Sequence, residues 1–221
     1  GRILVGADYS QIELRLLAHI SGDEGLIAAF NSGEDIHTST AAEVFGVDKA
    51  SVTREQRSAA KAVNFGIVYG ISDYGLAKNI GVSRKEAGEF IRRYLEKYCG
   101  VQEYMHRCVE EGRKKGYVTT LMGRRRELPE IKSSNFNTRS FGERVAMNMP
   151  IQGTAADIIK MAMVNVHKRL EEEGLKARLI LQIHDELIID TPFDEEQRVR
   201  KLLAECMQNV MKLKVPLIAD V

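Results

Sequence analysis

The chain has 221 residues, 44% of them apolar, so it can bury a sizeable core as one large domain or two small ones. Its 32 Lys and Arg residues nearly cancel its 31 Asp and Glu residues, and a net charge of +1 gives no bulk signal for a polyanionic partner. No apolar run approaches the roughly 18 residues of a membrane-spanning helix, and we expect no signal peptide. Three cysteines without metal-ligand spacing are typical of a reduced, intracellular protein.

The first half of the chain predicts one strand followed by a series of helices. "RILVGADYS" is typical of a buried strand that ends at Asp8, and Ser10 is placed to cap the next helix. Gly70 is placed to stop the helix predicted over residues 54–69. The later helical patterns cover residues 24–30, 38–45, 54–69, 83–98 and 101–115.

The second half predicts two hairpins and two helices. "GYVTTLMGRRREL" alternates as a hairpin with its turn near Met122 and Gly123. A long helix follows over about residues 137–173, and Pro150 and Gly153 should kink it. A second hairpin, a helix over residues 195–211 and a terminal strand complete the order. This order indicates an α+β fold, with a helical insertion between two parts of one sheet domain.

The second hairpin, "LILQIHDELIID", interrupts two apolar halves with His184, Asp185 and Glu186. One interpretation is a two-residue loop in which Asp tolerates a positive φ. The other is a carboxylate pair that holds a divalent cation at the tip of a strand. Asp8 also ends an apolar strand, and the two aspartates would meet if their strands are neighbours. Two-metal phosphoryl or nucleotidyl transfer needs such a pair, although aspartates at strand ends are common.

A stripe of four side chains follows one face of the helix predicted over residues 54–69. Arg57, Lys61, Phe65 and Tyr69 recur every four residues, so the stripe passes from cationic to aromatic. Cations would meet a triphosphate, and rings would pack on a sugar or base. The alternative is an ordinary amphipathic helix with aromatic residues in the core and solvated cations. The segment "GRKKGYVTTLMGRRR" has six basic and no acidic residues. This local positive charge could indicate contact with nucleic acid, and the alternative is a solvated hairpin.

Three segments closely resemble the polymerase motifs of the bacterial family A DNA polymerases, in the order and with a spacing similar to those of the family. They are "DYSQIELR", "RSAAKAVNFGIVYG" and "QIHDELI". Further segments resemble other parts of the family, so that the likeness covers essentially the whole chain. They are "GEDIHTSTA", "GRRRELPEI" and "ERVAMNMPIQGTAADIIKMAM".

The resemblance implies an antiparallel-sheet palm with a mostly helical fingers insertion. The palm would comprise residues 1–32 and 140–221, and the fingers residues 33–139. The thumb and exonuclease domains of the family are expected to be absent. The chain begins without Met inside one strand-like run and ends in another, so we expect both ends to be cut from a longer protein.

The resemblance also implies a role for each matching residue. Asp8 and Asp185 would ligate two Mg²⁺ ions, the Tyr9 carbonyl would add a ligand, and Glu186 would be a third catalytic carboxylate. The nucleotide-binding residues would be Gln11, Glu13, His37, Arg57, Lys61, Phe65 and Tyr69. The residues along the primer–template minor groove or primer end would be Arg144, Asn148, Gln152 and His184.

The function implied is template-directed transfer of deoxynucleotidyl groups from dNTPs to a primer 3′-hydroxyl, in replication and repair. The protein would be a monomer at the nucleoid of the bacterial cytoplasm. It would bind primer–template DNA and dNTPs, and it would not bind a membrane. A single-subunit RNA polymerase is one alternative, which Glu13 argues against because it would close off the space of a ribose 2′-hydroxyl. A catalytically silent DNA-binding fragment is the other, because the thumb is expected to be absent.

Overall fold

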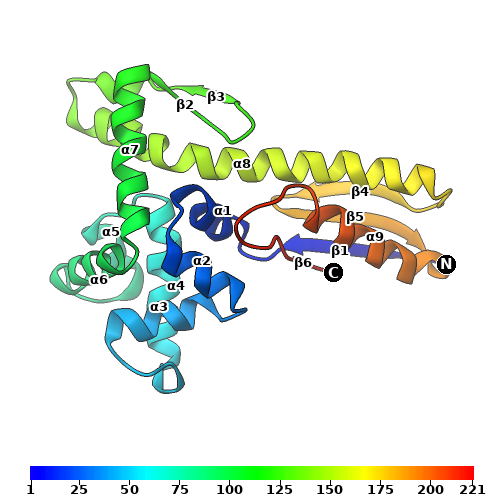
Figure 1. The fold of residues 1–221 in the computed structure, drawn as a ribbon, viewed down its shortest axis with the longest axis horizontal. Helices are drawn as coiled ribbons and strands as arrows, with labels where there is room; N and C mark the ends of the chain where they lie inside the picture. Colours follow the sequence, from blue (N-terminus) through cyan, green and yellow to red (C-terminus); the bar gives the residue numbers. More distant parts are fainter. The chain divides into compact units, whose positions relative to one another are not determined.

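The computed structural model describes all residues, Gly1–Val221, and the chain folds into two compact units. The smaller unit comprises Gly1–Ile12 and Gly153–Val221, and the larger unit comprises Glu13–Gln152. The smaller unit contains a four-stranded antiparallel sheet, whereas the larger is helical apart from a two-stranded hairpin (Figure 1). The predicted α+β class is therefore confirmed. The units are defined by compactness alone, so the division into a palm and fingers stays a prediction.

The sheet of the smaller unit has the strand order β4-β5-β1-β6, and each neighbouring pair is antiparallel. Its strands are β1 (Arg2–Tyr9), β4 (Arg178–Ile183), β5 (Glu186–Pro192) and β6 (Ala219–Asp220). The predicted terminal strand is present but has only two residues. The central pair, β1 and β5, aligns Asp8 with Glu186 and Arg2 with Pro192.

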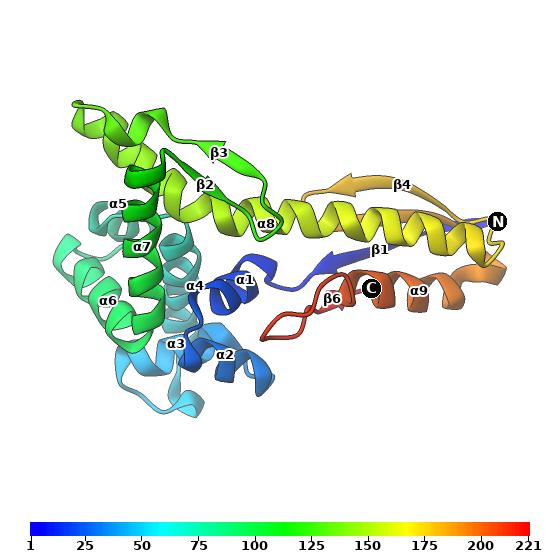
Figure 2. The same ribbon diagram turned by 45° about the horizontal axis from the view of Figure 1, so that its top comes forward.

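One face of the sheet is covered by α9 (Glu196–Gln208), which lies alongside β1 in both ribbon views (Figures 1 and 2). Alternate residues of β1 and β5 are buried, namely Val5, Ala7, Tyr9, Leu187, Ile189 and Thr191. The Tyr9 hydroxyl donates a 2.7 Å hydrogen bond to the carbonyl of Met207, which ties the end of β1 to α9. Because side chains alternate along a strand, Asp8 and Glu186 belong to the opposite face.

The longest helix, α8 (Phe136–Glu172), continues without interruption through Pro150. Its ends agree with the predicted range to within one residue, and the predicted kink stays a prediction. In the smaller unit, α8 lies beside α9, where Arg169 approaches Glu205 at 3.6 Å. Helix α9 itself ends three residues before its predicted end at residue 211.

The larger unit contains α1 to α7, the β2–β3 hairpin and the first part of α8. The helices are α1 (Ile12–Ser21), α2 (Glu24–Asn31), α3 (Ile36–Phe45), α4 (Arg54–Val68), α5 (Asp73–Ile80), α6 (Arg84–Lys97) and α7 (Cys99–Lys115). Five begin at a polar side chain that accepts a hydrogen bond from the third backbone N–H along the chain, which compensates for missing helical partners. These caps are Asp23, Asp35, Thr53, Ser72 and Ser83.

Local backbone geometry confirms two predicted turns and corrects one helix start. Gly70 has a φ of 65° directly after α4, and Gly123 has a φ of 81° in the turn between β2 (Tyr117–Thr119) and β3 (Arg125–Glu127). Helix α1 begins at Ile12 rather than directly after Ser10, because Gln11 has a φ of 54° and cannot be its first helical residue.

Helix α5 was not predicted from the sequence. Only one of its eight residues, Leu76, is buried, so its sequence marks no continuous apolar face. Its boundaries nevertheless carried a local signal, because Ser72 caps its start and Gly81 ends it in a left-handed conformation. None of the helices in the structure combines the length and apolar composition needed to span a bilayer.

We expect Gly142→Ala to destabilise the larger unit. A Cβ at Gly142 would lie 2.6 Å from the backbone nitrogen of Ile131, and no side-chain rotation can relieve a clash with backbone. The cost should be about 1–3 kcal/mol in the free energy of unfolding, measured by urea titration. Gly88→Ala in α6 is the control, because its nearest neighbour would be the Asp73 Cβ at 3.8 Å. That change should stabilise the protein by about 0.5–1 kcal/mol, and equal effects would contradict the packing argument.

Candidate active site

The carboxylates of the smaller unit gather where β1 ends and β5 begins. Asp8 pairs with Glu186 in the register of the sheet, and Asp185 lies in the two-residue turn from β4 to β5. The Tyr9 N–H donates to the Asp185 carbonyl at 3.3 Å, which holds this turn against β1. The turn predicted from the sequence is therefore confirmed, and so is the meeting of the two aspartates.

The positive φ of the turn falls on His184, at 53°, and not on Asp185 as predicted. Histidine is among the few residues other than glycine that are enriched in this conformation. Gln11 is the only other residue besides glycine that has a positive φ, and its side-chain Oε1 is buried without a hydrogen-bond partner. Backbone strain therefore lies on both sides of the carboxylate cluster, as is common at functional sites.

Electrostatics in this cluster show that the carboxylates are crowded. Burial raises the pKa of Asp8, and so do the charge of Asp185, a hydrogen bond between the two side chains and the charge of Glu186. Two adjacent carboxylates resist ionising together, and a divalent cation removes that repulsion. The cluster therefore has the electrostatic character of a cation site.

The number of side chains that could bind a cation indicates which type of cation suits the site. No group of three or more His, Cys, Asp or Glu side chains converges in a metal-binding arrangement. A closed structural site, such as a zinc site, is therefore not supported. A site with two carboxylates suits Mg²⁺, which usually takes one or two carboxylates and leaves its other positions to water and substrate phosphates.

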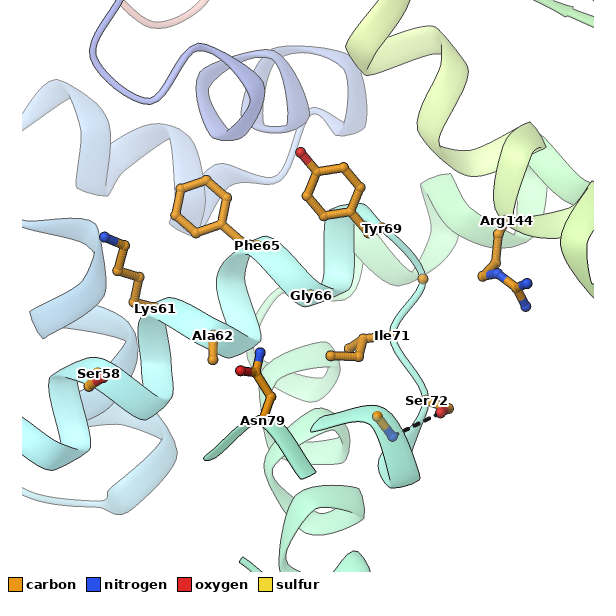
Figure 3. Close-up of a pocket in the computed structure, with 12 residues that line it drawn as sticks. Ser58, Lys61, Ala62, Phe65, Gly66, Tyr69, Ile71, Ser72, Asn79 and Arg144 are labelled. Atoms are coloured by element: carbon orange, nitrogen blue, oxygen red, sulfur yellow. Dashed lines mark hydrogen bonds between the residues drawn. The ribbon is translucent and has the colours of Figure 1, made fainter. Parts of the chain in front are cut away.

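In the larger unit, Lys61, Phe65 and Tyr69 project from one side of α4 (Figure 3). The predicted stripe on this helix is thus present, with Arg57 one turn earlier. The ring of His37, from α3, lies 5.8 Å from the ring of Phe65. Two cations and two aromatic rings therefore lie along one side of α4, with an imidazole of α3 beside them.

Arg57 is not isolated in this group, because Asp35 binds it through two hydrogen bonds. The distances are 2.6 Å from Nε and 3.2 Å from Nη2 to the two carboxylate oxygens. Partial burial raises the pKa of Asp35, but hydrogen bonds from Arg57 and Thr38 outweigh it and bring the pKa to about 2. The sequence analysis did not identify Asp35, although "GEDIHTSTA" contains its capping pattern with Thr38.

Glu13 and Tyr69 are in direct contact. The Tyr69 hydroxyl donates a 2.7 Å hydrogen bond to Oε2 of Glu13, across 56 positions of sequence. The bond joins the end of α4 to the start of α1 and holds a carboxylate and a ring against each other.

A pocket of about 650 Å³ opens beside the end of α4 (Figure 3). Its walls include Tyr69, Ile71, Asn79 on α5 and Arg144 on α8. Gly70 allows the close approach, since a Cβ there would lie 3.0 Å from the Cγ of Arg144. The pocket could accept a planar group against the ring of Tyr69.

Arg144, Asn148 and Gln152 recur every four residues of α8, so they share one face of the helix. Arg144 donates to the Ser140 hydroxyl at 2.9 Å. With its amide nitrogen facing α4, Asn148 donates to the carbonyl of Val68 and thereby caps the last turn of that helix. Gln152 is exposed, and His184, in the smaller unit, is exposed as well.

Crowded carboxylates at the strand ends of an antiparallel sheet, and a helical unit with a cationic and aromatic helix face, are features of a nucleic-acid polymerase domain. Comparison with known proteins agrees. The model of the family described as "DNA polymerase family A" matches residues 1–221. The chain belongs to DNA polymerase family A.

The chain is similar over nearly its whole length to curated bacterial proteins. It is 58% identical to DNA polymerase I of Caldicellulosiruptor bescii over 100% of the chain and 26% of that protein. It is 60% identical to DNA polymerase I of Bacillus subtilis over 99% of the chain and 25% of that protein. The chain thus spans about a quarter of the length of these relatives.

A solved structure has the same fold. The POL domain of Pol1 from M. smegmatis, in complex with DNA primer-template and dNTP, superposes with a TM-score of 0.94 at 45% identity. The match covers 100% of this chain and 39% of that one.

Proposed function

We propose that the chain is the palm-and-fingers part of a polymerase that carries out template-directed DNA synthesis in replication and repair. It would transfer a deoxynucleotidyl group from a dNTP to a primer 3′-hydroxyl and release pyrophosphate. The observation that carries this proposal is the placement of Asp8 beside Asp185, which the pairing of β1 with β5 and the bond from the Tyr9 N–H to the Asp185 carbonyl bring together. A replicative role would place the protein at the nucleoid of the bacterial cytoplasm, as a monomer.

Asp8 and Asp185, together with the Tyr9 carbonyl, would hold two Mg²⁺ ions. When bound, these ions would lower the pKa of the primer hydroxyl and neutralise charge on the leaving pyrophosphate. Glu186 lies opposite Asp8 in the sheet and would act as a third carboxylate of the site. Gln11, in its left-handed conformation, turns the chain from the strand that ends in these residues toward α1.

Lys61, Arg57 and His37 would bind the phosphates of the incoming nucleotide. A triphosphate offers oxygen acceptors to all three, and charge-assisted hydrogen bonds are the strong ones. Asp35 already occupies the guanidinium of Arg57, so it would orient Arg57 or compete with a phosphate for it. In the structure this carboxylate holds the Arg57 guanidinium in one orientation.

The rings of α4 would bind the rest of the nucleotide. Phe65 would pack on the sugar, while Tyr69 would stack on the template side, beside the pocket that it lines. Glu13, hydrogen-bonded to Tyr69, would close the space of a 2′-hydroxyl. The pair would therefore select deoxynucleotides by exclusion.

Arg144, Asn148, Gln152 and His184 would contact primer–template DNA. Minor-groove acceptors are nearly the same for every base pair, so donors directed at them can hold any sequence. The presence of DNA primer-template and dNTP in the M. smegmatis structure supports both partners. Asn148 would serve this role while also supporting α4.

The proposal is tested with a chimaera in which these 221 residues replace the matching segment of Bacillus subtilis DNA polymerase I. Primer extension and DNA binding are measured side by side. We expect template-directed extension with dNTPs, in the presence of Mg²⁺. DNA binding without extension would favour a silent binding fragment, and a preference for ribonucleotides would favour an RNA polymerase.

A further inference from the structure

The His37 side chain is only 4% exposed, yet two cationic side chains lie close enough to perturb it. Burial lowers the pKa of His37, the charge of Asp35 opposes this, and the charges of Arg57 and Lys61 lower the pKa further. The imidazole is therefore neutral at physiological pH, and it carries one proton on one of two nitrogens. Which nitrogen carries it decides where His37 can donate a hydrogen bond.

Asn64 contacts one of these nitrogens directly. Its Nδ2 lies 3.1 Å from the Nδ1 of His37, and the Asn64 side chain is completely buried in α4. An amide nitrogen is a donor without a lone pair, so Nδ1 must act as the acceptor. The single proton of the neutral ring then lies on Nε2.

The orientation of the Asn64 amide is supported from its other end. The Thr40 hydroxyl donates to the Asn64 Oδ1 at 3.2 Å, and Thr40 is also fully buried. An amide oxygen that accepts this bond leaves the amide nitrogen of Asn64 to face the ring of His37.

We propose that Asn64 is a positioning residue that fixes His37 as the tautomer with its proton on Nε2, and so directs that N–H to a phosphate oxygen of the incoming nucleotide. The phosphate as acceptor rests on the proposed function, whereas the tautomer does not. A residue without a donor at position 64 would leave the ring free to place its proton on Nδ1. The Nε2 atom would then present a lone pair to the phosphate, which repels it.

The tautomer is measured directly on the 221-residue chain by ¹⁵N–¹H correlation of its five imidazoles, with His37→Gln to assign the signal. We expect the unmodified protein to show a protonated Nε2 and an unprotonated Nδ1. A proton on Nδ1 would overturn the proposal without any variant having to fold.

Asn64→Asp replaces the donor by an acceptor of nearly the same shape. The variant should move the His37 proton to Nδ1 or produce the imidazolium, and it should raise the pKa of His37. Asn135→Asp is the control for added charge, because Asn135 already accepts from the Thr138 N–H at 3.1 Å and a carboxylate can do the same. An unchanged His37 signal in Asn64→Asp would overturn the role of Asn64.

The contact of His37 with the nucleotide is tested in the Bacillus subtilis chimaera. Asn64→Leu should raise the KM for dNTP about tenfold, the loss expected for one hydrogen bond to a charged group, with a smaller change in kcat and in DNA binding. If the tautomer shifts in Asn64→Asp but the KM stays unchanged in both variants, Asn64 still positions His37, while the phosphate contact of His37 is refuted.

Discussion

Asp185→Asn should stop nucleotide incorporation by the chimaera while leaving the fold intact. Asn keeps the shape of the side chain but removes a charge that a divalent cation needs. Loss of such a ligand should cost several kcal/mol of transition-state stabilisation, so kcat should fall by about three orders of magnitude or more. Asp8→Asn should behave in the same way, because the two carboxylates would share the ions. Single-turnover primer extension with saturating Mg²⁺ measures the loss.

Stability separates this loss of function from misfolding. The charge of Asp185 raises the pKa of Asp8, because two ionised carboxylates repel each other when no cation is present. Removing one charge should therefore leave the free energy of unfolding in EDTA unchanged or raise it. A fall in stability would make the lost activity uninformative.

Asp190→Asn, on the strand β5 that directly follows Asp185, is the matched control. Asp190 forms an exposed ion pair with Arg2 at 2.7 Å, and such pairs contribute little to stability. This variant should retain the kcat of the unmodified chimaera to within about twofold. Substantial turnover in Asp185→Asn, or an equal loss in Asp190→Asn, would refute the metal assignment.

Glu13→Ala should raise ribonucleotide incorporation by about two orders of magnitude relative to deoxynucleotide incorporation. The Glu13 carboxylate and the Tyr69 ring are joined by a 2.7 Å hydrogen bond, and together they would occupy the space of a 2′-hydroxyl. Discrimination is a difference between two transition-state energies. Removing the obstacle should lower the transition-state energy for the ribonucleotide and change that for the deoxynucleotide little. The measurement is the ratio of kcat/KM for a matched nucleotide pair.

Glu13→Gln distinguishes a steric mechanism from an electrostatic one. Gln has nearly the same volume and still offers an oxygen to the Tyr69 hydroxyl. If discrimination is steric, Glu13→Gln should keep most of it. An unchanged ratio in Glu13→Ala would remove the proposed gate, and with it the main argument against an RNA polymerase.

Local rules predicted most of the elements. Thr53 and Ser83 each form a capping box at the start of a helix, and Gly70 ends α4, because these features depend on residues within one turn. Helix α5 was missed because only one of its residues, Leu76, is buried, and α9 was predicted too long by three residues because helix ends fray without a clear stop.

The candidate site was predicted in its residue types but not in their partners. The strand that was predicted to end at Asp8 and the hairpin that contains Asp185 suggested a carboxylate pair, and the sheet brings the two residues together. By contrast, neither Asp35 nor Asn64 was singled out. Their importance arises from Arg57 and His37, which lie 22 and 27 positions away in the sequence. Contacts between helices of such separation leave no periodic signal.

The amino-acid sequence by itself predicted most of the strands and helices of this protein, the glycine that ends α4, and which charged and aromatic residues share one face of that helix. These features follow from backbone propensity and side-chain periodicity, which act over a few residues. Only the tertiary structure decided that Asp185 meets Asp8, that His184 takes the positive φ of the turn, and that a buried amide faces the ring of His37. Such outcomes depend on packing between segments far apart in the chain, because a buried polar group takes the partner that the surrounding fold supplies.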